Sequence, residues 1–155
     1  MKKLVTVALA ALLLLLSIAC SASVIDEAFS HLGEPYRYGR QGPHSFDCSG
    51  FTYYCYLEIE GIKLKRSAKA QGYDDTYEKI EEIEDLKIGD LVFFNTNTRD
   101  SDLSDHAGLY IGDGYFIHAS SGKNKHKVVI STLLEGFYNE HFSWGRRVVE
   151  DIWHK

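Results

Sequence analysis

Cys48 and two histidines, His106 and His118, are the residues of this chain whose types and positions predict covalent chemistry. Cys48 follows Asp47, a good helix cap, where a polar loop gives way to an apolar segment. The sequence therefore predicts that Cys48 lies in the first turn of a helix, where the helix dipole favours the thiolate and lowers the thiol pKa. A cysteine so placed is a candidate nucleophile, and the alternative is a buried structural cysteine.

The two histidines belong to a predicted β-hairpin. His106 opens the segment 106–111, His118 lies near the end of the segment 115–119, and a Gly-Asp-Gly turn signal separates the two segments. Because the start of one antiparallel strand lies beside the end of the next, the two imidazoles are expected to touch on one face. One histidine would take the proton of Cys48 and the other would orient it, and the residues alone leave open which does which.

A zinc site formed by the same cysteine and two histidines is a further alternative, although no closely spaced pair of ligands supports it. The remaining histidines lie in polar or terminal settings and are expected to be solvated: His31, His44, His126, His141 and His154. Cys55 follows Cys48 by seven residues, about 10 Å along an intact helix, which is too far for a disulfide. We expect Cys55 to be a core residue.

The elements that must position these residues are predicted as helices first and strands later. Helical spacing or capping signals mark residues 23–32, 46–59 and 67–71, and loop signals cover 33–45 and 95–105. Predicted strands are 91–94, 106–111, 115–119, 127–130 and 144–149. This order favours an α+β domain with a largely antiparallel sheet over alternating βαβ units.

Residues 1–19 have the pattern of an export signal, with two lysines, an apolar run and small residues before Cys20. Ser17-Ile18-Ala19-Cys20 resembles the lipobox of bacterial lipoproteins. We therefore expect cleavage before Cys20 and lipidation of this residue, which would anchor the protein in a membrane. The alternative is an ordinary secretory signal that is cut a few residues later. The domain itself is predicted to occupy residues 23–155.

Charge argues against nucleic acid as a partner. The chain of 155 residues has 17 basic and 22 acidic residues, and removal of residues 1–19 leaves 15 against 22, a net charge of −7. A domain so acidic lacks the positive surface that binds phosphates. The length predicts a single domain. We expect a monomer without a cofactor or a metal.

Five motifs resemble the NlpC/p-sixty family of bacterial cell-wall cysteine peptidases. In chain order they are Gly33-Glu34-Pro35-Tyr36-Arg37-Tyr38-Gly39, Asp47-Cys48-Ser49-Gly50-Phe51, Gly89-Asp90-Leu91-Val92-Phe93-Phe94, His106-Ala107-Gly108-Leu109-Tyr110-Ile111-Gly112 and Phe116-Ile117-His118-Ala119-Ser120. The resemblance implies a papain-like α+β fold in which the cysteine helix packs on an antiparallel sheet. It also implies an exported enzyme of the cell envelope that cleaves an amide bond in the stem peptides or cross-links of peptidoglycan.

The resemblance assigns roles by motif position. It implies that Cys48 is the nucleophile, His106 the general base and His118 the residue that orients His106. It also implies that the hydroxyl of Tyr36 lies near the nucleophile and assists the oxyanion, the alternative being a loop aromatic packed on the core.

Three further residues match positions that contact the substrate in this family. Asp47 and Ser49 match positions that hold the peptide end of the substrate, and helix capping by Asp47 is compatible with that role. Arg66 lies in a segment that loosely resembles the one after the catalytic helix, and a surface arginine is the alternative. Two other functions remain open: an acyltransferase or amidase on another substrate, and a cell-wall-binding lipoprotein without catalytic activity.

Overall fold

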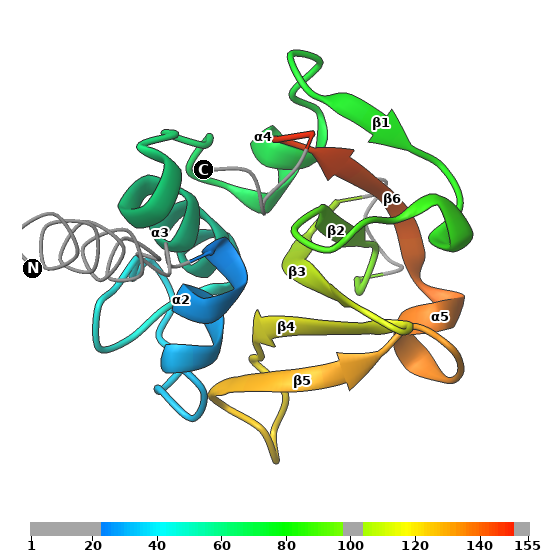
Figure 1. Cartoon of the computed structure of the whole chain (residues 1–155). Helices are drawn as coiled ribbons and strands as arrows, with labels where there is room; N and C mark the ends of the chain where they lie inside the picture. The colour runs from blue at the N-terminus through cyan, green and yellow to red at the C-terminus, as the bar shows by residue number, and fades with distance from the viewer. Residues whose placement is uncertain (1–22, 98–103, 151–155) are drawn as a thin grey trace, which may run out of the picture.

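The computed structural model describes residues 23–97 and 104–150. Three helices, α2 (Val24–Ser30), α3 (Cys48–Glu60) and α4 (Ala68–Gly72), precede a six-stranded antiparallel sheet (Figure 1). The strands are β1 (Glu78–Ile80), β2 (Leu91–Phe94), β3 (His106–Gly112), β4 (Tyr115–Ala119), β5 (Val128–Thr132) and β6 (Phe142–Arg147). A 3₁₀ turn, η1 (Ile83–Asp85), and a short helix, α5 (Phe137–Glu140), complete the fold. The predicted α+β class is confirmed.

The sheet has the order β1-β6-β2-β3-β4-β5, so the last strand of the chain lies between the first two. A buried ion pair holds β6 there: Nη2 of Arg147 lies 2.8 Å from Oδ2 of Asp90, and Nε of Arg147 donates to Oδ1 of Asp90 at 3.1 Å. Asp90 directly precedes β2, so this paired charge links the start of β2 to the end of β6. Leaving either partner unpaired in the interior would destabilise the fold.

Local signals explain where the first two helices begin and end. Ser23 caps α2 and forms a reciprocal capping box with Asp26. Asp47 caps α3 by accepting a hydrogen bond from the backbone N–H of Gly50 at 2.7 Å. Gly61 ends α3 in the left-handed conformation with φ of 67°, which a residue without a side chain adopts without strain.

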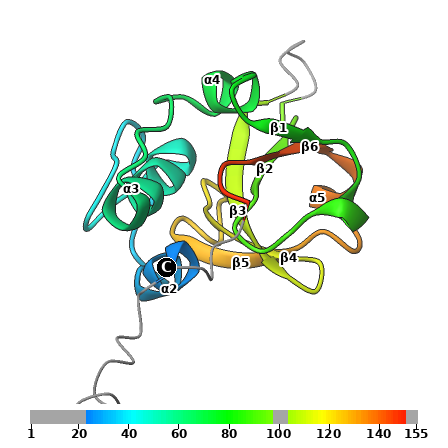
Figure 2. The same ribbon diagram turned by 45° about the horizontal axis from the view of Figure 1, so that its top comes forward.

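The two faces of the sheet have separate hydrophobic cores. One core joins α2, α3 and α4 to the sheet and contains the buried rings of Phe46, Phe51 and Phe93. The other contains Phe94 and Phe116, against which α5 packs through Tyr138. Figure 2 shows α5 on the side of the sheet away from α2 and α3. Each fully buried phenylalanine contributes about 2 to 3 kcal/mol of transfer free energy.

Most predicted elements are present with shifts at their ends. Residue 46 lies in the loop before α3 rather than in the helix, and the last strand begins at 142 instead of 144. Sequence signals do not predict β1, η1 or α5. These elements have only three or four residues, too few to show a hydrophobic period, and their positions depend on the sheet that they pack against.

In the part of the chain that the structure describes, no helix is both long enough and apolar enough to cross a membrane. The predicted signal segment 1–19 and Cys20 lie outside the described residues, as does His154. Cleavage and lipidation therefore stay predictions.

Candidate active site

Cys48 is the first residue of α3, as predicted. The loop before α3 packs closely against this first turn, because a methyl group on Gly50 would clash with the carbonyl oxygen of Arg40. The Asp-Cys-Ser-Gly order therefore serves two needs: Asp47 caps the helix, and Gly50 lets the loop approach the cysteine. Cys48 is half-buried, whereas Cys55 is fully buried in the core, and both thiols are free.

The sulfur of Cys48 meets the start of β3. The backbone N–H of Ala107 donates a hydrogen bond to Cys48, and the N–H groups of Cys48 and Ser49 also favour the thiolate. Burial outweighs these groups and, with the nearby Asp47 carboxylate, raises the pKa of Cys48 to about 11. The sequence-based expectation of a lowered thiol pKa is therefore wrong. The helix terminus is present, but loss of water around the sulfur has the larger effect.

His106 and His118 lie side by side, as the hairpin predicted. Nε2 of His106 is 2.7 Å from Nδ1 of His118, and the two rings are almost perpendicular at 87°. Leu109 pairs with Ile117 across β3 and β4, which sets the two histidines on one face as diagonal neighbours. Gly108 gives them room, because a methyl group there would lie 2.7 Å from Phe116 and 3.1 Å from Cβ of His118.

Burial keeps both imidazoles neutral at neutral pH. It lowers the pKa of His106 to about 4, against a small opposing effect of Asp105. Burial also lowers the pKa of His118 well below its usual value, and the positive charge of a protonated His106 or of Lys125 acts in the same direction. The resting site therefore holds a protonated thiol and a neutral imidazole pair, the state from which an imidazole acts as a general base.

Tyr36 comes from the loop before α3 and lines the same cavity as Cys48. Its backbone N–H donates to the carbonyl of His126 at 3.1 Å, and its ring lies edge-on to the His126 ring. The ring also packs against the core that joins the helices to the sheet, as expected of a loop aromatic packed on the core. Burial and the nearby Cys48 and Asp47 raise the pKa of Tyr36 to about 12, so its hydroxyl keeps its proton.

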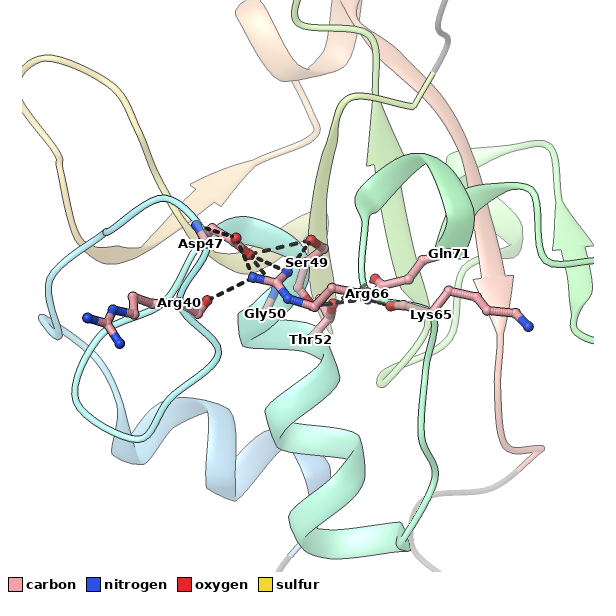
Figure 3. A network of polar contacts seen from close by, with 9 residues as sticks. Arg40, Asp47, Ser49, Gly50, Thr52, Lys65, Arg66 and Gln71 are labelled. Carbon is pink, nitrogen blue, oxygen red and sulfur yellow. Dashed lines mark hydrogen bonds and ion pairs between the residues drawn. The ribbon is translucent and has the colours of Figure 1, made fainter.

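Arg66 and Asp47 form a bidentate ion pair at one end of the cavity (Figure 3). Nη1 of Arg66 donates to Oδ1 of Asp47 at 3.0 Å and Nη2 donates to Oδ2 at 2.6 Å. Nη1 also donates to Oγ of Ser49 at 3.2 Å. The Arg66 side chain is 40% exposed, against 9% for Asp47. The structure thus brings together all three residues that the sequence analysis singled out for substrate contact.

Gln71, which the sequence analysis missed, ties the Arg66 segment to α3. Its Nε2 donates to the carbonyl of Ser49 at 3.0 Å and to that of Lys65 at 2.7 Å, and its Oε1 accepts a hydrogen bond from Thr52. Gln71 is almost fully buried, so these bonds are made away from water. The side chain therefore fixes the backbone on both sides of the ion pair.

Cys48, Tyr36 and the Arg66–Asp47 pair lie at one cavity of about 500 Å³. It is lined by Tyr36, Tyr38, Gly39, Asp47, Cys48, Ser49, Arg66, Ser67, Ala68, Lys69, Ser104 and Asp105. A cavity of this size accommodates a small molecule or a short peptide segment.

Tyr138 of α5 is another residue that the sequence analysis missed. Its ring stacks on His106 with centroids 6.1 Å apart and lies edge-on to His118 at 5.1 Å. Its hydroxyl bonds to Ser120, and burial raises its pKa. The side chain therefore covers the histidine pair. No local pattern predicted this, because α5 has only four residues.

The other described histidines lie apart from this pair. His44 and His126 are exposed, as expected. The expectation of a solvated side chain is wrong for His31. Its side chain is only 13% exposed, pairs with Glu27 at 3.1 Å and packs against the ring of Phe46. Within the described residues, no three His, Cys, Asp or Glu side chains gather as metal ligands. His106 and His118 direct one ring nitrogen each at the other, not at a shared point.

The NlpC/P60 family model matches residues 33–147, which is most of the chain. The chain belongs to the NlpC/P60 family. All site residues named above fall within the matched range.

Relatives of this NlpC/P60 protein include two bacterial enzymes and a solved structure. It is 36% identical over 126 residues to murein DD-endopeptidase MepH of Escherichia coli strain K12, covering 81% of this chain and 45% of MepH. It is 39% identical over 125 residues to gamma-DL-glutamyl hydrolase of Bacillus subtilis strain 168, covering 80% and 28%. NlpC1 from Trichomonas vaginalis has a TM-score of 0.70 at 30% identity, covering 85% and 44%. The chain spans less than half the length of each of these three proteins.

Proposed function

We propose that this NlpC/P60 protein is a cysteine peptidase of the cell envelope that hydrolyses an amide bond in the stem peptides or cross-links of peptidoglycan. The observation that carries the proposal is the meeting of Cys48, at the start of α3, with β3, whose first residue His106 is hydrogen-bonded to His118. The similarity to a murein DD-endopeptidase and to a gamma-DL-glutamyl hydrolase supports amide hydrolysis as the reaction.

The reaction begins with proton transfer inside the site. Nδ1 of His106 accepts the proton of the Cys48 thiol as the sulfur attacks the carbonyl carbon of the substrate. His118 holds His106 through Nε2 and stabilises the imidazolium that forms. Because both residues start neutral, thiolate forms as His106 takes up its proton.

Hydrogen-bond donors must stabilise the negative charge that develops on the carbonyl oxygen of the substrate. The N–H of Cys48 is one donor, since it lies in the first turn of α3 and has no acceptor within the helix, and the hydroxyl of Tyr36 is a second. The raised pKa of Tyr36 keeps that hydroxyl protonated and able to donate. When the tetrahedral intermediate collapses, His106 gives its proton to the leaving amine.

The second half of the reaction regenerates the enzyme. Water enters in place of the amine, and His106 takes a proton from it as it attacks the thioester carbon. Collapse of the second intermediate breaks the carbon–sulfur bond, releases the carboxylic acid product and returns the proton to Cys48. Entry of an amine or alcohol instead of water would make the protein an acyltransferase.

Arg66, Ser49 and Asp47 are proposed to hold the peptide end of the substrate. Oδ1 of Asp47 accepts from Gly50, Arg66 and, at 3.4 Å, the hydroxyl of Ser49, and Oδ2 accepts from Gly39 and Arg66. A carboxylate has about four acceptor positions, so these bonds occupy them. We expect Asp47 to act by holding Arg66 in place, while the exposed edge of Arg66 and the hydroxyl of Ser49 make the direct contacts.

The test is digestion of purified peptidoglycan by the wild-type protein and by Cys48→Ala, with mass spectrometry of the released fragments. We expect cleavage by the wild type and none by Cys48→Ala. Cys55→Ala is the matched control, since it removes the other thiol of α3 and should retain most of the activity. Undiminished cleavage by Cys48→Ala would contradict the mechanism. Binding without products would favour the non-catalytic alternative, and amine-linked products would favour a transferase.

Attachment to a membrane is a separate proposal that rests on the lipobox-like Ser17-Ile18-Ala19-Cys20. Cells that express the full chain with a radiolabelled fatty acid should label the wild type and not Cys20→Ser. An equal signal from both would leave an ordinary secretory signal as the explanation.

A further inference from the structure

The hydrogen bonds of the histidine pair continue to a third residue. Nε2 of His118 lies 3.0 Å from Oγ of Ser131 on β5, while Nδ1 of the same ring faces Nε2 of His106 at 2.7 Å. We propose that Ser131 is a positioning residue, which holds His118, and through it His106, in the arrangement of protons that lets His106 act as a base toward Cys48. The inference rests on the proposed function.

The position of each proton follows from the three groups in series. A neutral imidazole carries one N–H, and His106 must leave Nδ1 bare to accept the proton of Cys48. Its hydrogen is then on Nε2, which donates to Nδ1 of His118. Nδ1 of His118 is therefore bare, and the hydrogen of this second ring is on Nε2. That N–H donates to Oγ of Ser131.

The sheet register brings Ser131 to this place. Ser131 pairs with Phe116 across β4 and β5, and Val129 pairs with His118. Side chains two residues apart share a face, so Ser131 is the diagonal neighbour of His118. Phe116 stacks on the His118 ring at 4.7 Å and 28°, which holds the plane of the ring. Packing thus fixes the plane of the His118 ring, and Ser131 fixes the proton on its Nε2.

The other groups around His118 are compatible with the same arrangement. His106 meets the ring from β3, and Tyr138 meets it edge-on from α5 with its hydroxyl bonded to Ser120. The positive charge of Lys125 disfavours a second proton on His118. Ser131 is the acceptor that the structure provides at Nε2.

Loss of the Ser131 hydroxyl would leave the buried Nε2–H without that acceptor. Because an unsatisfied buried donor is costly, the tautomer of His118 with its proton on Nδ1 would become more favourable. This N–H would then face the N–H of His106. Two donors cannot share a 2.7 Å contact, so His106 would shift its own proton to Nδ1. In that state His106 has no bare nitrogen for the proton of Cys48, and the nucleophile is not activated.

The first test reads the protons directly and does not depend on hydrolysis. Long-range ¹H–¹⁵N spectra of histidine-labelled protein distinguish bare from protonated ring nitrogens, with His118→Asn used for assignment. We expect bare Nδ1 and protonated Nε2 on both rings of the wild type, and a mixture or the reverse in Ser131→Ala. A bare Nε2 on His118 in the wild type would overturn the inference. The expected spectra from a protein that cleaves no peptidoglycan would refute the proposed function alone.

The second test is kinetic. Ser131→Ala should lower kcat by about tenfold or more with KM nearly unchanged, the effect of losing one buried hydrogen bond behind a base. Ser131→Thr, which restores a hydroxyl, should recover most of the rate. Thr132→Val is the control, because it removes a hydroxyl from the next residue of β5, one that bonds to Leu134 instead of a histidine. Equal losses in Ser131→Ala and Thr132→Val, or no rescue by threonine, would show a merely structural role.

Discussion

Arg66 holds Asp47 through two parallel hydrogen bonds of 3.0 and 2.6 Å, directly beside the residue that begins α3. This geometry is specific to a guanidinium, because its planar fork matches both carboxylate oxygens at once. The same Arg66 nitrogen that reaches Oδ1 of Asp47 also bonds to Ser49. One partly exposed side chain thus connects the helix cap to the wall of the cavity.

Arg66→Lys tests this pair. Lysine keeps the charge but loses the fork, so the substrate-facing wall should loosen, and we expect KM to rise by about tenfold with a smaller change in kcat. Steady-state kinetics on a purified muropeptide measure both. Lys65→Ala is the neighbouring control, since the bond from Gln71 to residue 65 uses only its carbonyl. A KM for Arg66→Lys equal to that of wild type would argue against direct contact with the substrate.

The acid limb of the pH–rate profile should report the buried base. His106 works only when neutral, so kcat/KM falls as the pH drops through its pKa, which burial lowers to about 4. We expect full activity at pH 6 and a decline centred near pH 4, measured on a soluble muropeptide over a series of buffers. A decline centred near 6.5, the value of a solvated histidine, would mean that the imidazole is not desolvated in solution.

Tyr138 should set that acid limb by covering the histidine pair. Tyr138→Ala admits water to His106 and weakens the desolvation that lowers its pKa, so the decline should move to higher pH. Tyr138→Phe keeps the ring and loses only the bond to Ser120, so its decline should stay near that of the wild type. The measurement is kcat/KM as a function of pH for the wild type and the two variants. A shift of the same size in both variants would assign the effect to the hydroxyl instead of the ring.

Stability should depend on pH through His106 and His118. Their pKa values in the folded state lie below the unfolded value of about 6.5, so the unfolded chain binds more protons in between. The contribution of the two neutral histidines to the free energy of unfolding is therefore fully present above pH 6.5. It is lost as the pH falls toward 4, at up to about 1.4 kcal/mol per pH unit for each histidine. Urea unfolding at several pH values measures this loss.

A comparison of variants isolates the contribution of the pair from that of the acidic residues. His118→Asn should lose less stability between pH 7 and pH 4.5 than the wild type, because it has one buried histidine fewer to protonate. His44→Asn, which changes an exposed histidine, should behave like the wild type. Identical pH dependence in all three proteins would mean that the buried pair does not govern acid stability.

The chain by itself determined the parts of the site that depend on local signals. Asp47 and Gly50 around Cys48 specify the start of a helix, and the Gly-Asp-Gly turn is enough to bring His106 beside His118. Caps and two-strand turns involve residues close in sequence, so their geometry can be inferred from spacing alone. The family motifs carried the same local information, and they lie in the residues that the family match covers.

Only the tertiary structure decided what surrounds these residues. Ser131, Tyr138 and Gln71 reach the site from β5, α5 and α4, through sheet register and packing between segments far apart in the chain. The pKa of Cys48 is the clearest case, because the helix start predicted a lower value and the structure gives a higher one. A helix terminus is encoded in a few neighbouring residues, whereas the exclusion of water depends on every element that packs around the sulfur.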